Sequence, residues 1–446
     1  MDPMAPPDES ASPPAGLLSR IDLREVTGPV AALLPAPQIV DDPDAAGAVR
    51  AILAEVRQNG DAGLRAATER FDRVRIDEIR VPPDEVEAAV DRIPADLRRA
   101  LETAHDNISD YHASQLHPEA RYERDGVVVR ELRRPVERAG CYVPGGRAPL
   151  ASTVLMTAVP ARVAGVGRVA VCSPPGPDGR LAPSVLAAAA IAGVDEVYRV
   201  GGAQAIAALA YGTESVPAVD VIVGPGNRYV AIAERLVAGE GAVGVPSAFT
   251  GPSEVAVVAD DSTDPTHAAV DLVVQAEHGP DGLAYLITWS ERAAERIGAE
   301  VERITRGSPR RAEIEATLAR GGYSVLVADR GQAVAVANAV AAEHLEIMCA
   351  DPETLVPEIR SAGAVFLGPL APASTGDYAA GPNHVLPTAR SARFGSALRV
   401  NDFCRYIHVV DIDQRGFDRL APAVEALAVS EGLAAHADSI RFRQQP

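Results

Sequence analysis

The stretch that decides the fold is DEVYRVGGAQAIAALAYGTESVPAVDVIVGPGNRYVAIAERLVAG, residues Asp195–Gly239. It opens with a strand-like run, continues through an alanine-rich helical run, and returns to the apolar run VDVIV before a second helical run. Strands that alternate with helices in this way form parallel sheets with helices on both faces. The stretch therefore predicts an α/β module built on a parallel sheet.

The same alternation extends to both sides and defines the domain organisation. It covers residues 137–250, which predicts a first Rossmann-like module, and restarts at residue 251, which predicts a second module up to residue 371. Residues 21–136 have mainly helical periodicity, and we expect them to pack on the second module. Residues 1–20 are expected to be a disordered tail. Residues 372–399 are loop-rich, and they are followed by the predicted strand YIHVVDI and a last predicted helix capped by Ser430. Residues 372–446 are too few to hold a core, so we expect a C-terminal arm that packs on another surface, such as a second subunit.

The composition is that of a large globular protein without nucleic-acid or membrane partners. Of 446 residues, 47% are hydrophobic, yet no apolar run is long enough to span a membrane. The formal net charge of −19 argues against a nucleic-acid partner, because the phosphate backbone requires a basic surface. The four cysteines lie far apart without a Cys-x-x-Cys pair, which favours reduced thiols and a cytoplasmic location.

Two kinds of chemistry are excluded or disfavoured by single residue types. The chain contains no lysine, and all 42 residues counted as lysine or arginine are arginine. Schiff-base catalysis and Walker-type phosphate binding need a lysine and are excluded. Cys141 and Cys172 are potential thioester-forming nucleophiles, but neither has an adjacent histidine, so buried, unreactive thiols are the better interpretation.

Two glycine turns directly follow predicted strands of the first module. Gly201-Gly202 precedes one helix, and Gly224-Pro225-Gly226 precedes another that Asn227 can cap. Such turns present backbone N–H groups at the carboxyl edge of a parallel sheet, where nucleotides bind. Either turn alone fits an ordinary tight turn equally well, but two on consecutive strands favour a nucleotide cleft. The G-x-G-x-x-A match at Gly165–Ala170 precedes its strand and does not fit a phosphate loop.

Gln275 and His278, near the end of the predicted helix Pro265–His278, are candidate metal ligands. A spacing of three puts both side chains on one helix face, where they can bind one ion. A solvated helix end is the commoner origin of such a pair, but we expect this helix to end at the same carboxyl edge as the glycine turns. Asp377 in a glycine-flanked loop and His436 on an otherwise apolar helix are the best remaining donors, although spacing cannot join them to the first pair.

Glu343 and His344 repeat the letters Ala-Glu-His at the end of a second predicted helix, which leads directly into a buried strand. At such a junction between a helix and a strand, two adjacent side chains can both face a cleft. A glutamate and a neutral imidazole are suited to general acid–base catalysis near neutral pH. A polar helix terminus, where the helix dipole favours histidine, is an equally good interpretation on local grounds.

Eight motifs, taken in order, resemble the histidinol dehydrogenase family, and the similarity covers nearly the whole chain beyond the first twenty residues. They are CYVPGGRAPLASTVLMTAVPA, VGGAQAIAALAYGTESVP, VDVIVGPGNRYVAIAE, TGPSEVAVVAD, DLVVQAEHGPDG, AAEHLEI, GDYAAGPNHVLPT and EGLAAHADSIRFR. The resemblance implies an α/β fold with two Rossmann-like, aldehyde-dehydrogenase-like modules. It also implies that the C-terminal arm reaches into the active site of a partner subunit.

The activity implied by the resemblance is the last step of histidine biosynthesis. L-histidinol would be oxidised to L-histidine through L-histidinaldehyde by a cytoplasmic homodimer, with two NAD+, one water and one Zn2+ per subunit. The implied metal ligands are Gln275, His278, Asp377 and His436. The implied NAD contacts are Tyr142, Gln204 and Asn227. The implied acid–base pair is Glu343 and His344, and the implied substrate contacts are Ser253, Gln275, His278, His344, Asp377, Glu431 and His436.

Two other classes of function compete with this interpretation. One is a zinc hydrolase on an α/β scaffold with Glu343 or Glu277 as base, which would not reduce NAD+ when given histidinol. The other is a non-enzymatic nucleotide-binding module, against which the intact set of candidate ligands and acid–base residues argues. In the favoured interpretation, histidinol chelates the ion, His344 takes the hydroxyl proton and Glu343 activates the water.

Overall fold

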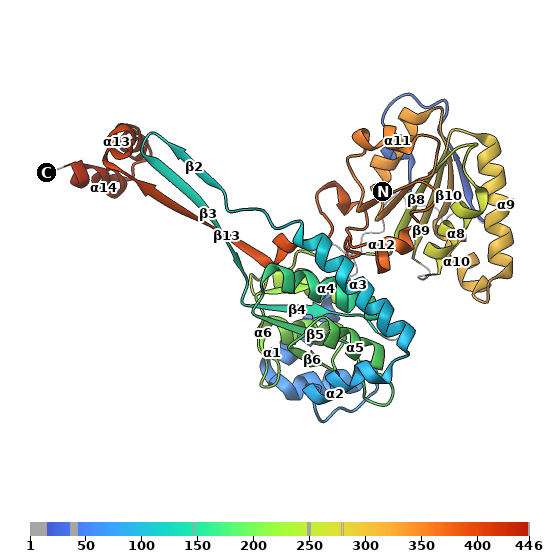
Figure 1. The fold of residues 1–446 in the computed structure, drawn as a ribbon, viewed down its shortest axis with the longest axis horizontal. Coiled ribbons are helices and arrows are strands. Elements are labelled where there is room, and N and C mark those ends of the chain that lie inside the picture. Colours follow the sequence, from blue (N-terminus) through green and yellow to red (C-terminus); the bar gives the residue numbers. More distant parts are fainter. Residues whose placement is uncertain are drawn as a thin grey trace, which may run out of the picture.

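The structure is a computed structural model that describes residues 16–35, 43–145, 148–247, 251–277, 279 and 281–444. Within this range the strands form two parallel sheets and one antiparallel sheet (Figure 1). Each parallel sheet is the core of one module, and the antiparallel sheet belongs to an arm that extends away from both modules. The predicted α/β fold with two parallel-sheet modules is therefore confirmed.

The first module is a four-stranded sheet in the order β6-β5-β4-β7. Its strands are β4 (Arg138–Tyr142), β5 (Arg168–Cys172), β6 (Glu196–Tyr198) and β7 (Val221–Val223). Helices α4 (Ala151–Ala164) and α5 (Pro183–Ile191) cover one face, and α6 (Gly202–Tyr211) and α7 (Arg228–Gly239) cover the other. Neighbouring residues of one strand enter opposite cores, Cys141 on the α4 side and Tyr142 on the α6 side, because strand side chains alternate.

The N-terminal α-helices pack on this first module, so the prediction that residues 21–136 pack on the second module was wrong for these helices; at the start of the region, Leu23, Val30 and Leu34 do pack on the second module. α1 (Pro43–Asp72) contacts α6 and α7, whereas α2 (Pro83–Ala88) and α3 (Ala95–Ala113) contact α5 and α4. Apolar periodicity identifies the buried face of a helix, as at Leu101, Ala104 and Ile108 of α3. It does not identify which of two apolar surfaces receives that face, and this limited the prediction.

The second module is a six-stranded parallel sheet in the order β1-β10-β9-β8-β11-β12. Its strands are β1 (Ser19–Asp22), β8 (Glu254–Ala259), β9 (Leu283–Thr288), β10 (Gly322–Leu326), β11 (His344–Ile347) and β12 (Ala364–Leu367). One face carries α8 (Pro265–Ala276), α9 (Glu291–Gly307) and α10 (Arg311–Gly321), and the other carries α11 (Arg330–Val340). Strand β1 lies at the edge and includes Ser19 and Arg20, so the prediction of a disordered tail was wrong for these two residues of the segment 1–20.

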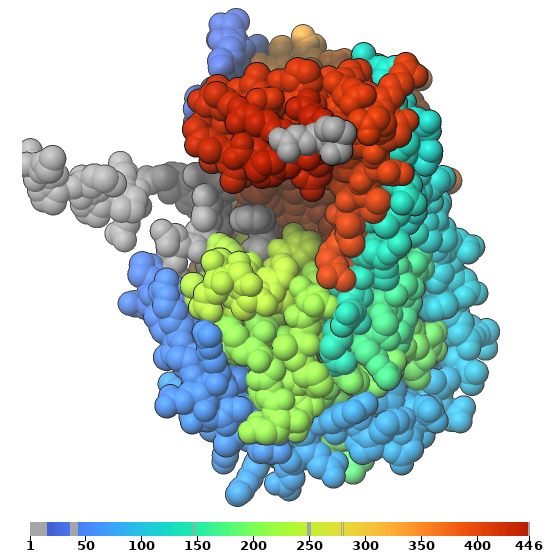
Figure 2. Space-filling view, turned by 90° about the vertical axis from the view of Figure 1, so that its left-hand side faces the viewer, coloured from blue at the N-terminus to red at the C-terminus, as the bar shows by residue number. Residues whose placement is uncertain are grey.

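The chain leaves the second module through α12 (Ala373–Tyr378) and returns to the first before it enters the arm. The arm is the antiparallel sheet β13-β3-β2 with two helices at its far end (Figure 1). Its elements are β2 (Arg121–Arg124), β3 (Val127–Pro135), β13 (Cys404–Ile412), α13 (Gln414–Ser430) and α14 (Ala434–Gln444). Figure 2 faces this far end, where the helices appear in red. No helix in the described ranges is long and apolar enough to cross a membrane.

Two boundaries in the arm and the second module differ from those predicted. Ser430, which we expected to cap the last helix, ends α13, and its hydroxyl donates to the carbonyl oxygen of Leu427. The helix that precedes Glu343 was predicted to end at Glu343-His344. It ends at Val340, because Ala341 takes the left-handed conformation with φ 49°. Glu343 therefore lies in a turn, and His344 is the first residue of β11.

Candidate active site

The predicted catalytic residues gather at one edge of the second sheet. His344 opens β11, Ser253 directly precedes β8, and Gln275 lies in the last turn of α8. This is the amino edge, so the prediction that α8 ends at the carboxyl edge was wrong. A helix that joins two parallel strands runs back along the sheet, and its C-terminus therefore meets the beginning of the next strand.

His344 lies between a carboxylate and a backbone carbonyl group. Its Nε2 is 3.1 Å from Oδ1 of Asp377, and its Nδ1 is 3.2 Å from the carbonyl oxygen of Glu254. Burial alone would lower the pKa of this imidazole, but the charges of Glu343 and Asp377 outweigh burial and raise the pKa to about 9. In this arrangement both ring nitrogens donate hydrogen bonds and the ring carries a positive charge at neutral pH.

Glu343 is buried beside this imidazole. Its Oε2 accepts a hydrogen bond of 3.0 Å from the backbone N–H of Glu254 and lies 3.7 Å from Nδ1 of His344. The Ser253 side chain also hydrogen-bonds to the Glu343 carboxyl group. Burial raises the pKa of Glu343 above its usual range, although the His344 charge opposes the shift. The Glu343 carboxyl group and the His344 imidazole therefore influence each other electrostatically, while 3.7 Å is too long for a hydrogen bond between them.

Glu254 is a third buried carboxyl group in this cluster, and sequence reasoning did not identify it. Its Oε1 accepts a hydrogen bond of 3.1 Å from the backbone N–H of Ala389, while its Oε2 has no partner within the described chain. Burial, reinforced by the charge of Glu343, raises the pKa of Glu254 to about 8. The side chain is therefore a neutral carboxylic acid at neutral pH.

The variant Glu254→Gln is expected to be more stable than the wild type at alkaline pH. An unfolded Glu254 ionises near 4.5 and the folded one near 8, so the wild type loses stability as the pH rises through this interval. An amide does not titrate, which gives the variant an advantage of at most ~5 kcal/mol above about pH 8 and none below about pH 4. Denaturant unfolding across this range measures the difference. Parallel stability curves for the two proteins would contradict the assignment.

Gln275 is the predicted metal ligand whose surroundings are most unusual. Its side chain is 4% exposed, and its Nε2 has no hydrogen-bond partner within the described chain. Burying an amide without a partner is unfavourable, and rotation of the amide would bring its oxygen, the atom that binds metals, to the same place. His278 lies outside the described residues. Among the described residues, no three His, Cys, Asp or Glu side chains form a metal-binding group.

Asp377 joins the site from α12, with its side chain one quarter exposed. Besides the contact with His344, its backbone oxygen lies 2.8 Å from Nδ1 of His384. Nε2 of His384 is 3.2 Å from Oγ1 of Thr153 in the first module, and burial lowers the pKa of this imidazole. The neighbouring Asn383 donates to the backbone oxygen of Met156. We assigned no role to His384, yet it connects the Asp377 segment to the first module.

His436 and Glu431 lie apart from all these residues. Glu431 follows the end of α13 and His436 lies in α14, both at the far end of the arm. Both residues are exposed. One chain therefore brings together Ser253, Gln275, Glu343, His344 and Asp377, but not the two residues of the arm.

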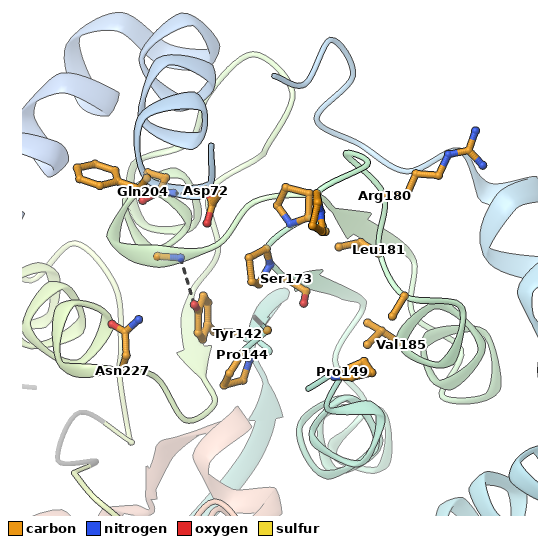
Figure 3. A pocket seen from close by; sticks show the side chains of 18 of the residues that line it. Asp72, Tyr142, Pro144, Pro149, Ser173, Arg180, Leu181, Val185, Gln204 and Asn227 are labelled. Carbon is orange, nitrogen blue, oxygen red and sulfur yellow. Dashed lines mark hydrogen bonds between the residues drawn. The ribbon is translucent and has the colours of Figure 1, made fainter. Parts of the chain in front are cut away.

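The second predicted cleft lies at the carboxyl edge of the first sheet as a cavity of about 830 Å3 (Figure 3). All three predicted NAD contacts line it, and the Tyr142 hydroxyl accepts a hydrogen bond of 3.1 Å from the N–H of Gly202. Oδ1 of Asn227 caps α7 by accepting from two N–H groups of its first turn, at 2.9 Å and 3.2 Å. Two of the side chains predicted to contact the cofactor therefore stabilise the glycine turns: Tyr142 the turn at Gly202, and Asn227 the start of the helix after Gly226.

Asp72 is a cleft residue that the sequence did not reveal, because it comes from the end of α1. Its Oδ2 accepts a hydrogen bond of 3.2 Å from Nε2 of Gln204, and burial raises its pKa to about 6. A carboxylate in a nucleotide cleft can accept hydrogen bonds from ribose hydroxyl groups. The only sequence signal was a lone acidic residue at a helix end, which is common on any surface.

Comparisons with known proteins agree with one another. The family model for histidinol dehydrogenase matches residues 37–444. A histidinol dehydrogenase from a Synechococcus strain is 48% identical over 401 residues, which cover 89% of this chain and 92% of the relative. Another from Gluconobacter oxydans is 46% identical over 410 residues, covering 90% and 94%. The crystal structure of histidinol dehydrogenase from Elizabethkingia anophelis matches with a TM-score of 0.91 at 33% identity, covering 96% and 98%.

The fold, the order of the motifs and these relatives lead to one assignment. The family match spans both modules and the arm, so it includes every predicted site residue. The zinc hydrolase and the non-enzymatic module are set aside, because the family is one of oxidoreductases of histidine biosynthesis. The chain belongs to the histidinol dehydrogenase family.

Proposed function

We propose that the protein catalyses the four-electron oxidation of L-histidinol to L-histidine through L-histidinaldehyde, with two NAD+, one water and one zinc ion per subunit. The observation that carries this proposal is the buried Glu343–His344 pair beside Asp377 and the unpartnered amide of Gln275. An acid–base pair next to carboxylate and amide ligands is what oxidation of a chelating amino alcohol requires.

The proposed metal ligands are Gln275, His278, Asp377 and His436. Oxygen and nitrogen donors of this kind suit zinc, and the unpartnered Gln275 amide fits such a group. When bound, the ion would supply a fixed positive charge that holds the imidazole and amine of histidinol and orients the alcohol carbon. Ser253, Glu431 and the ligands themselves would surround the substrate.

His344 would take the hydroxyl proton in the first oxidation. Its high pKa in the structure is due partly to Asp377, whose Oδ1 is 3.1 Å from Nε2. Asp377 would hold the metal ion, which would leave less of its charge to act on His344, so the imidazole would give up its proton more readily. Glu343, whose pKa is raised by burial, would accept a proton from the water that hydrates the aldehyde.

NAD+ would bind in the cavity of the first module, with Tyr142, Gln204 and Asn227 in contact with it. The Asn227 cap leaves the N-terminal turn of α7 well ordered beside the cavity, and helix N-termini attract the phosphates of a dinucleotide. The two hydride transfers would use the same cavity in turn, and NAD+ would be the acceptor in both.

The arm would complete the active site of a second subunit in a homodimer. In one chain His436 and Glu431 lie far from Gln275 and Asp377, so they cannot act on the same substrate. The arm also exposes large apolar side chains that a partner would cover; these are Ile407, Val410, Val424, Leu427, Val429, Leu433 and Phe442. The four cysteines are free, in keeping with a reducing compartment, and we propose a cytoplasmic location.

Removal of the metal is expected to abolish NADH formation from L-histidinol. The test is the NADH absorbance with histidinol and NAD+ before and after chelation, with metal content measured in parallel. Zinc added back is expected to restore the rate. Full activity in metal-free protein would contradict the metal assignment, and absence of NADH formation at any metal content would contradict the proposed oxidation.

A further inference from the structure

Two carboxyl groups that the proposed mechanism does not use lie together beneath the site. Glu346 in β11 is 1% exposed and Asp271 in α8 is 8% exposed. Their side chains are hydrogen-bonded to each other. Oε1 of Glu346 also accepts a hydrogen bond of 2.9 Å from the backbone N–H of Ala373, and no N–H group of the described chain donates to its Oε2.

Two carboxyl groups can form this hydrogen bond only if one of them carries a proton. Two carboxylates in contact would repel each other strongly in a buried environment, and among the described residues no arginine acts on them. The histidines that act on the pair are His267, one turn earlier on α8, and His344, two residues earlier on β11. Burial accordingly raises the pKa of both carboxyl groups.

The pair connects the three elements that carry the candidate site. Asp271 lies one turn before Gln275 on α8. Glu346 and His344 lie on the same face of β11, opposite Leu345 and Ile347, which belong to the core under α11. Ala373 begins α12, the helix that carries Asp377 to within 3.1 Å of His344. A closed set of contacts therefore runs from α8 through Glu346 to α12 and back to β11.

We propose that Asp271 and Glu346 form a proton-sharing positioning pair, which holds α8 and α12 at the separation that lets Gln275 and Asp377 bind one metal ion. This rests on the proposed metal site. Neither residue touches the substrate in this proposal. The pair acts through the helices that it joins, and its loss should appear first as weaker metal binding.

The test compares an amide with an apolar side chain at the same position. In Glu346→Gln the amide oxygen can still accept from Ala373 and the NH2 group can replace the shared proton toward Asp271, so zinc affinity is expected to stay within about threefold of the wild type. In Glu346→Leu both bonds are lost, and zinc affinity is expected to fall by roughly 10–100-fold. Competition with a chromogenic chelator measures zinc affinity without any activity assay. Circular dichroism reports on folding.

Asp271→Ala and Asp271→Asn repeat the comparison from the other helix, in case Glu346→Leu does not fold. Loss of affinity in Asp271→Ala and its rescue in Asp271→Asn would support the pair. The control is Glu234→Leu, which removes a fully buried carboxyl group from the first module and should leave zinc affinity unchanged.

The outcomes separate this proposal from the metal assignment. Wild-type protein that binds no zinc would refute the metal site itself. Wild-type protein that binds zinc, together with folded apolar variants of unchanged affinity, would refute the positioning pair alone. An infrared difference spectrum, wild type minus Glu346→Gln, that contains a protonated-carboxyl band would support the shared proton, because Glu254 and Glu234 contribute equally to both proteins and cancel. A difference spectrum without such a band would place the proton elsewhere.

Discussion

Replacement of His344 with asparagine is expected to lower kcat by roughly 10²–10⁴-fold, because it removes the group that would take the hydroxyl proton. Asparagine is small enough for this buried position and places its amide group where Nδ1 of the imidazole lies, so it can still donate to the carbonyl oxygen of Glu254. The fold and the metal content are therefore expected to be retained. Steady-state formation of NADH at saturating histidinol and NAD+ measures the loss.

A matched control is available on the surface of the first module. His105 in α3 is half-buried, and its Nδ1 lies 3.0 Å from Oδ1 of Asp106, away from both candidate sites, so His105→Asn should have wild-type kcat. Metal content and thermal unfolding of both variants distinguish a lost base from a lost fold. A His344→Asn enzyme with full metal content and less than a tenfold loss of kcat would show that another group takes the proton.

Mixed dimers of two inactive variants are expected to regain activity if the arm serves the partner's site. Asp377→Ala would inactivate the body of one chain, and His436→Asn would inactivate the arm of the other. In a mixed dimer, one site then combines an intact body with an intact arm, while the other site carries both defects. With random exchange, half of the dimers are mixed, so about a quarter of wild-type activity should return.

A second mixture provides the control for this experiment. Gln275→Ala and Asp377→Ala both affect the body, so each site of their mixed dimer carries one defect and no activity should return. Exchange of subunits is verified with differently tagged chains. If the first mixture stays as inactive as the second, each site is built within one chain and the interpretation of the arm is wrong.

The sequence predicted the two modules well because strands buried on both faces have a strong signature. Runs such as Val221–Val223 and Leu283–Thr288 are apolar throughout, and each is followed by a helical run. The glycine turns at Gly202 and Gly226 were equally clear, because their position after a strand is meaningful without any distant partner. These features depend only on neighbours along the chain.

The features that were missed depend on contacts between distant segments. Glu254 begins a strand and Asp72 ends a helix, and neither position is unusual until Glu343 or Gln204 lies beside it. The edge at which α8 ends could have been predicted, because a helix that joins two parallel strands runs antiparallel to them and ends where the next strand begins. The expectation that Asp377 and His436 bind one metal ion came from the family resemblance, since no spacing rule links residues so far apart.

The chain passes back and forth between the two modules, and this limits how the modules can move relative to each other or be separated. Strand β1 belongs to the second module, α1 through α7 to the first, β8 through α12 to the second, and the segment at Val400–Phe403 to the first again. Three covalent connections therefore cross between the modules. A single proteolytic cut in one of them cannot release either half, and a rotation of one module must satisfy all three tethers together. A continuous fragment of the second module would lack the edge strand β1, and one of the first module would lack Val400 and Phe403, which belong to its core.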